Sequence, residues 1–223
     1  MPSRSRQIEV LCPECQAPNP FLQWEVVDSA ENPELCQQIL DGSLFDFTCR
    51  NCEEEITLDF SIRLEDHVRE RMVQYDAPRG SRLALVDPPK PWYKLRLVRD
   101  QNAYIELVRI WNDNLEDYVM LVLKHLLVRE YETETGQRPL LCSYMSRFSE
   151  SELDRFEYAI SFVGDAGPRF TSGDVPYPEL MFGMSRHAEE LMPNGHWAAW
   201  DHEMAQRLLD AYWPDWPRLN ART

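Results

Sequence analysis

Four cysteines in two pairs carry the most specific chemistry that this chain offers. Cys12-Pro13-Glu14-Cys15 is answered by Cys49-Arg50-Asn51-Cys52. Thiolate sulfur is a soft ligand that suits zinc, and four thiolates complete the tetrahedral shell of a structural site. Two Cys-x-x-Cys turns therefore predict one zinc ion per chain, held by Cys12, Cys15, Cys49 and Cys52. Thiols that bind nothing, a redox pair and iron in place of zinc remain alternatives.

A shell made of four protein thiolates leaves no open position for a substrate, so the predicted zinc is structural. The sequence contains no G-x-S-x-G, Walker or G-x-G-x-x-G motif. Cys36 and Cys142 are expected to be small buried hydrophobic residues. The sequence thus predicts no catalytic residue and favours a non-catalytic module over an enzyme.

The segments around the cysteine turns have the alternating polarity of β-strands. Apolar residues alternate with polar ones over residues 8–10 and again over residues 56–64. The long insert between the turns has the signals of a short helix, with Asn32 as its cap, Pro33 at its first position and Gly42 after its end. We therefore expect a zinc-ribbon-like β lobe with a helical insert.

Residues 8–77 resemble the CpXC-domain family of bacteria and archaea. The resemblance is carried by the two cysteine turns and by the insert, from Asn32-Pro33-Glu34-Leu35 to Leu40-Asp41-Gly42-Ser43-Leu44-Phe45. Further similarity at residues 95–98 and 114–124 extends it over about the first 130 residues. The resemblance implies a zinc-binding domain, in a family to which no function is assigned.

The chain departs from the family pattern at both turns. Family turns usually read Cys-Pro-x-Cys-Gly, whereas Gln16 and Glu53 stand at the glycine positions and Arg50 at a proline position. Glycine there tolerates positive φ, so these side chains predict a looser metal shell. The family tends to have Tyr-His-Asp after the last strand of this lobe; the nearest match here is Glu65-Asp66-His67.

Beyond the β lobe, the pattern predicts an α+β protein in three parts: residues 8–77, 78–135 and 136–223. Residues 64–75 are expected to form an amphipathic helix, and residues 93–111 a hairpin. The helix that starts near Leu115 is apolar on most sides and is predicted to be the buried centre of a second α+β lobe. The last part is a C-terminal α+β extension with an aromatic tail.

Composition limits the classes of partner. The 223 residues carry a net charge of −15, and residues 1–77 hold 6 basic and 16 acidic groups. Phosphate binding requires clustered Lys and Arg, so the acidic lobe argues against nucleic-acid binding. No stretch has the ~20 apolar residues of a membrane helix, and no apolar segment follows the basic N-terminus. We expect a cytoplasmic protein that does not enter membranes.

The sequence is compatible with three functions. The leading one is a protein-interaction module that binds a partner or itself through the aromatic C-terminus, Trp197 to Trp216, although this tail could equally pack on its own domain. The second is an enzyme with a cleft near His67 and Arg71. The third is nucleic-acid binding through the basic stretch Arg79–Arg99, which could instead neutralise the acidic lobe.

Overall fold

The computed structural model describes residues 2–79, 82–149, 154–162 and 165–214. Contacts divide the chain into two compact units. Unit 1 comprises Met1–Val108 and Asn194–Ala198, and unit 2 comprises Arg109–Pro193 and Ala199–Thr223. Both contain helices and strands, so the predicted mixed α+β class is confirmed. The predicted three-part division at residues 77 and 135 stays a prediction.

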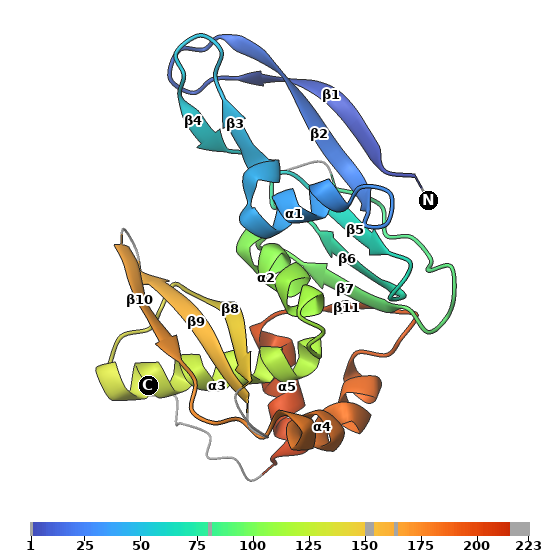
Figure 1. The fold of residues 1–223 in the computed structure, drawn as a ribbon, viewed down its shortest axis with the longest axis vertical. Coiled ribbons are helices and arrows are strands. Elements are labelled where there is room, and N and C mark those ends of the chain that lie inside the picture. The colour runs from blue at the N-terminus through green and yellow to red at the C-terminus, as the bar shows by residue number, and fades with distance from the viewer. Residues whose placement is uncertain (1, 80–81, 150–153, 163–164, 215–223) are drawn as a thin grey trace. The chain divides into compact units, whose positions relative to one another are not determined.

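Unit 1 is built on a six-stranded mixed sheet with the order β1-β2-β5-β6-β7-β11 (Figure 1). The strands are β1 (Arg4–Leu11), β2 (Pro18–Asp28), β5 (Ile62–Asp66), β6 (Arg71–Tyr75), β7 (Lys94–Val98) and β11 (Trp197–Ala199). The pairs β1–β2 and β5–β6 are antiparallel, whereas β2–β5 and β6–β7 are parallel. Every residue of β5 is buried, which places this strand at the centre of unit 1.

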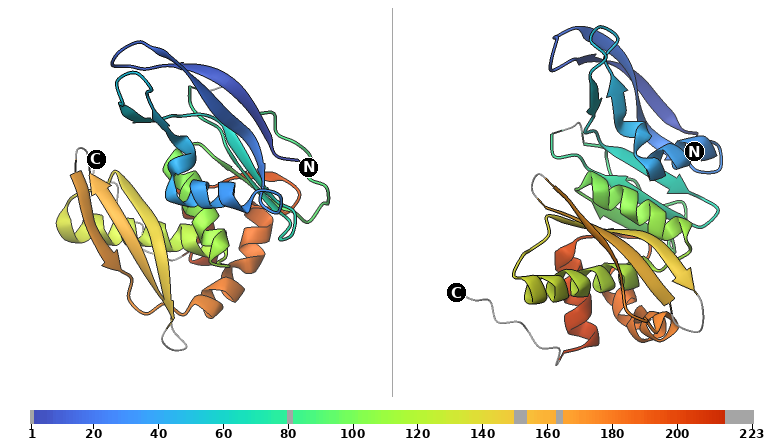
Figure 2. Two further views of the ribbon diagram at one scale, coloured as in Figure 1. Left: turned by 45° about the horizontal axis from the view of Figure 1, so that its top comes forward. Right: turned by 60° about the vertical axis from the view of Figure 1, so that its left-hand side comes forward.

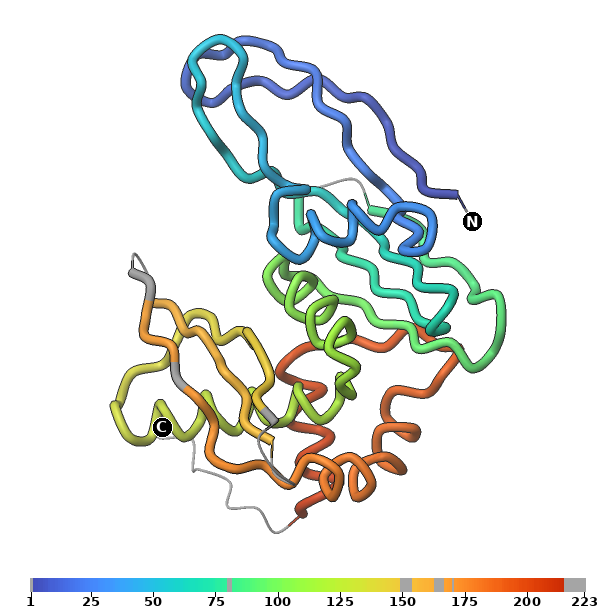
Figure 3. Tube along the Cα trace, viewed as in Figure 1, coloured from blue at the N-terminus to red at the C-terminus, as the bar shows by residue number. Residues whose placement is uncertain are grey.

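A second, two-stranded sheet joins β3 (Asp46–Thr48) to β4 (Glu55–Thr57). Helix α1 (Pro33–Asp41) and a short 3₁₀ turn (Ser43–Phe45) connect β2 to β3. The predicted insert helix is therefore confirmed, and Gly42 ends it in the left-handed conformation, at φ 87°. The Cα trace shows the β1–β2 turn and the β3–β4 turn meeting at the same end of unit 1 (Figure 3).

The predicted helix over residues 64–75 is wrong, because this segment forms the antiparallel pair β5–β6 with a turn between Asp66 and Arg71. Both strands are buried on nearly all positions. A strand that is buried on both faces loses its alternation of apolar and polar residues, so chance spacings of three and four imitate a helix.

Two further predictions are corrected in unit 1. The predicted returning strand of the hairpin over residues 93–111 is helix α2 (Gln101–Asn112), which buries Tyr104, Leu107 and Val108 at helical spacing. The strand predicted over residues 56–64 is divided between β4 and β5, which belong to different sheets. The ring of Tyr104 lies 6.1 Å from that of Tyr75, so α2 packs on the sheet of unit 1.

Unit 2 is organised around α3 (Asp117–Thr135), whose first six residues are buried. This agrees with the core helix predicted from Leu115 onward. The sheet β10-β9-β8 packs on α3, as the right-hand view of Figure 2 shows. Its strands are β8 (Leu141–Ser149), β9 (Asp154–Phe162) and β10 (Asp165–Thr171). Helices α4 (Tyr177–Leu191) and α5 (His202–Tyr212) pack on α3 and on each other.

The C-terminal helices match the sequence prediction in part. The helix predicted near residues 178–191 is α4, and the one predicted over residues 197–212 starts later, at His202. Asp201 caps α5 through a hydrogen bond from the Met204 N–H. Trp216 of the predicted aromatic tail lies outside the described residues. No helix in the described part of the chain is long and apolar enough to cross a bilayer.

Candidate metal centre

The structure brings the four predicted cysteines together from two different hairpins. Cys12 and Cys15 lie in the turn between β1 and β2, and Cys49 and Cys52 lie in the turn between β3 and β4. The Sγ atoms of Cys12 and Cys52 are 3.6 Å apart, as are those of Cys15 and Cys49, and all four lie within 4.8 Å of one another. A tetrahedral zinc with Zn–S bonds of about 2.3 Å separates its sulfurs by about 3.8 Å. The thiol group can therefore hold a metal ion of this size.

Both turns use the same backbone pattern to aim their sulfurs. The Gln16 N–H donates to the Cys12 carbonyl at 3.0 Å, and the Glu53 N–H donates to the Cys49 carbonyl at 2.9 Å. Gln16 and Glu53 have positive φ, 57° and 62°. Glycine was expected at these two positions from the family pattern. The positive φ explains that preference, because glycine adopts such a conformation without the strain that an L-residue has.

The four thiols are not equally accessible. Cys12 and Cys49 are 0% and 1% exposed, whereas Cys15 is half-buried and Cys52 is exposed. Cys12 and Cys49 form an apolar cluster with Phe47, around which further residues pack: Val10, Cys15, Phe21, Ile56 and Leu58. The centre thus has a dry base and one side that solvent can reach.

Hydrogen bonding stabilises the thiolate form of two cysteines. Backbone N–H groups of Cys52 and Asn51 lower the pKa of Cys49 to about 6. The backbone N–H of Ala17 and the Asn51 side chain lower the pKa of Cys15. At Cys52 a backbone hydrogen bond from Glu54 lowers the pKa, but the neighbouring thiols and burial outweigh it and raise the pKa. Because a thiol must lose its proton to bind a metal, Cys15 and Cys49 are the two cysteines whose surroundings favour metal binding.

Asn19 is a residue of this centre that the sequence analysis did not identify. It lies in β2, four residues after Cys15, and is 2% exposed. Its Nδ2 donates to the Ala17 carbonyl at 2.9 Å and lies 3.5 Å from the Cys49 Sγ, and its Oδ1 accepts the Arg50 N–H at 2.9 Å. No local motif reveals this role, since the two turns are joined only in the folded chain.

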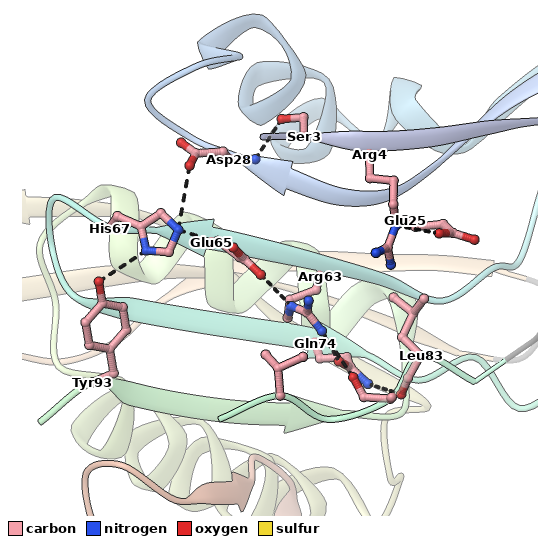
Figure 4. A network of polar contacts seen from close by, with 12 residues as sticks. Ser3, Arg4, Glu25, Asp28, Arg63, Glu65, His67, Gln74, Leu83 and Tyr93 are labelled. Atoms are coloured by element: carbon pink, nitrogen blue, oxygen red, sulfur yellow. Dashed lines mark hydrogen bonds and ion pairs between the residues drawn. The ribbon is translucent and has the colours of Figure 1, made fainter. Parts of the chain in front are cut away.

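The second predicted candidate, His67, lies in a polar network on the sheet of unit 1 (Figure 4). Its Nδ1 is 3.1 Å from the Tyr93 hydroxyl. Its Nε2 is 3.2 Å from Glu65 Oε2 and 3.7 Å from Asp28 Oδ2. The Cα atoms of Asp28 and Glu65 are partners in the parallel β2–β5 pair. Both ring nitrogens of His67 therefore have protein partners.

Arg71 and His67 have different partners. Arg71 is the first residue of β6 and His67 lies in the β5–β6 turn, so they do not share a helical face as predicted. Arg71 Nε lies 3.2 Å from Asp66 Oδ2, its partner across the β5–β6 pair. The polar network continues from Glu65 to a buried Arg63, with 2.8 Å between Nε and Oε1. The Arg63 Nη1 also donates to the Ala84 carbonyl, which ties the segment before β7 to the sheet.

The structure shows the surroundings of three cations of the basic stretch Arg79–Arg99. Arg96 is buried in β7. Lys90 and Arg82 lie 2.7 Å and 3.7 Å from carboxylate oxygens of unit 1. Neutralisation of the acidic unit is thus seen directly for these two cations. Cys142 is buried as expected, and Cys36 is half-buried, where desolvation raises its pKa to about 11.

Comparison with known proteins gives one match. No curated protein and no solved structure matches the chain. The family model described as "CpXC protein" matches residues 10–124, which include all four cysteines of the centre, Asn19, and the helices α1 and α2. This region covers more than half of the 223 residues, and it agrees with the extent that the sequence motifs indicated. The chain therefore belongs to the CpXC protein family.

Proposed function

We propose that Cys12, Cys15, Cys49 and Cys52 bind one zinc ion whose role is structural. The observation that carries this proposal is the meeting of four thiol sulfurs, from two hairpins with the same turn geometry, at separations close to those of a tetrahedral zinc–thiolate site. All four positions of such a shell come from the protein, so the ion has no site for a substrate.

The metal replaces a hydrophobic core that the two hairpins are too small to build. The buried part of their apolar cluster is formed by Cys12, Phe47 and Cys49. Two of these three residues are proposed ligands, so the cluster depends on the ion for its cohesion. Because the free energy of binding a structural zinc is folding free energy, loss of the ion is expected to separate the hairpins.

At the level of the whole protein, we propose a non-catalytic protein-interaction module. His67 lies 3.1 Å from the Tyr93 hydroxyl and 3.2 Å from Glu65 Oε2, and these contacts account for its place in the fold without a catalytic role. In unit 2, Phe182 is 73% exposed and Trp213 is 40% exposed. Aromatic side chains anchor protein interfaces, so these two support binding of a protein partner or of a second copy.

Within the predicted tail, Trp200 is 2% exposed and donates to the Asp117 carbonyl, and Trp197 donates to the Val86 carbonyl. Both therefore pack in the protein, and the proposal rests on the exposed aromatic residues alone.

The zinc proposal is tested by metal analysis of freshly purified protein. We expect about one zinc per wild-type chain. Cys12→Ser and Cys49→Ser should lose the metal, whereas Cys36→Ser is a matched control that should keep it. Folded, fully reduced protein without metal would refute the site. Iron in the purified protein, with a visible thiolate charge-transfer band, would show that the site binds iron and not zinc.

The interaction proposal is tested separately by the oligomeric state and by partner capture. Phe182→Ser and Trp213→Ser together should abolish self-association in light scattering, or the capture of a specific partner that the wild type retains. Phe148→Ser, at another exposed aromatic residue of unit 2, is the control. An unchanged oligomeric state and an unchanged set of partners would refute the role of the C-terminal surface.

A further inference from the structure

The Asn19 side chain connects the first cysteine turn, the second cysteine turn and a thiol sulfur. Its amide group is planar, with the nitrogen end in contact with both turns and the oxygen end in contact with the second. The Nδ2 end contacts the Ala17 carbonyl of the first turn and the Cys49 sulfur, while the Oδ1 end accepts the Arg50 N–H of the second turn. Asn19 is almost completely buried, so no water competes strongly for these contacts.

The contact with sulfur has an electrostatic consequence. Four thiolates around a divalent ion leave the centre with net negative charge, and N–H groups that point at sulfur offset it. Such donors to Cys49 Sγ include Asn19 Nδ2 at 3.5 Å and the Asn51 N–H at 3.4 Å. Groups that hold and polarise metal ligands in this way typically alter metal affinity 10- to 100-fold when removed.

We infer that Asn19 is a positioning residue that retains the metal by keeping Cys49 as the permanent ligand, so that exchange of the ion begins at the exposed Cys52. The inference rests on the proposed zinc site and adds the order in which the site opens. Cys49 is buried, hydrogen-bonded through sulfur and tied to the first turn through Asn19. Cys52 lies on the open side, and its Sγ is 3.6 Å from the Cys12 Sγ.

The test compares Asn19→Ala and Asn19→Asp with Gln23→Ala, in full-length protein loaded with zinc. Gln23 is a buried polar residue on the same strand and is the matched control. Release of zinc to a chromophoric chelator should be roughly 10- to 100-fold faster in Asn19→Ala and unchanged in Gln23→Ala. Asn19→Asp should be faster still, because it keeps an acceptor for Arg50 but turns a carboxylate oxygen toward sulfur.

Two further readouts separate this role from a general loss of packing. With cobalt in place of zinc, the thiolate-to-metal charge-transfer band should move to longer wavelength in Asn19→Ala and not in Gln23→Ala. Position-resolved alkylation of the wild-type zinc protein should modify Cys52 well before Cys49. In Asn19→Ala, the rate at Cys49 should rise toward that at Cys52.

The outcomes distinguish the two proposals. Wild-type protein without metal would overturn the zinc site itself. One zinc in the wild type, together with wild-type release rates and an unshifted cobalt band in both Asn19 variants, would overturn the role of Asn19 alone. If Asn19→Ala does not fold, equal alkylation rates at Cys49 and Cys52 in the wild type would still refute the inference.

Discussion

Replacement of Glu53 by glycine is expected to stabilise unit 1. Glu53 has φ 62° in the second cysteine turn, and an L-residue in the left-handed region is disfavoured by roughly 1–2 kcal/mol. Its side chain is exposed, and no hydrogen bond or ion pair of it is found among the described residues. Little is therefore lost when the side chain is removed, and one negative charge beside the thiolates is removed with it.

The expected magnitude follows from two opposing terms. Relief of the backbone strain gains roughly 1–2 kcal/mol, and the greater freedom of glycine in the unfolded chain costs about 0.5–1 kcal/mol. The net gain is about 0.5–1 kcal/mol, or about 1–4 °C in the temperature at which the protein releases zinc on heating. The assay is thermal unfolding of the zinc-loaded protein with a chromophoric chelator present.

Neighbouring variants separate strain from charge. Glu54→Gly removes the same charge at a residue without positive φ, so it should destabilise the protein by about 0.5–1 kcal/mol. Glu53→Ala removes the charge and keeps the strain. Gln16→Gly should gain less than Glu53→Gly, because the Gln16 side chain donates to the Pro13 carbonyl. A midpoint for Glu53→Gly at or below that for Glu54→Gly would refute the reasoning.

Three other predictions concern parts of the fold outside the metal centre. Glu65→Ala, which leaves a buried Arg63 without its ion-pair partner, should cost about 3–5 kcal/mol in urea unfolding, and a loss below 1 kcal/mol would show that the pair is not buried in solution. Burial raises the pKa of the Cys36 thiol from 9.0 to about 11, so at pH 8 it should be alkylated roughly 100-fold more slowly than an ordinary thiol. The alkylation rate should climb with pH until the pH passes about 11, and a normal rate at pH 8 would contradict the burial of Cys36. Asp201→Ala should cost about 1 kcal/mol by removing the cap of α5, whereas Asn32→Ala, at a cap position without such a bond, should change stability little; equal losses would refute the capping argument.

Sequence motifs predicted correctly those elements whose structure depends on residues close together in the chain. Two Cys-x-x-Cys turns predicted the cysteine cluster because each turn fixes the direction of its own sulfurs. The insert helix, the core helix and α4 were predicted because capping residues and helical spacing act within a few residues.

Non-local pairing explains the elements that were misassigned. Residues 64–75 form two strands because β2 and β7 pair with the outer edges of β5 and β6. Both strands are buried at nearly every position, which removes the alternation that identifies a strand. Residues 104–111 form a helix whose apolar residues are buried at helical spacing, and in unit 1 its Tyr104 meets Tyr75 and Phe45.

The sequence by itself predicted the cluster of four cysteines and the family, because these depend on residue type and short spacing. The tertiary structure alone decided how the site is held. It placed Asn19 in contact with both cysteine turns, whose cysteine pairs are separated by 33 residues of the chain, and it left Cys52 exposed while burying Cys49. Such differences arise from contacts between distant segments, and no periodicity along the chain records them.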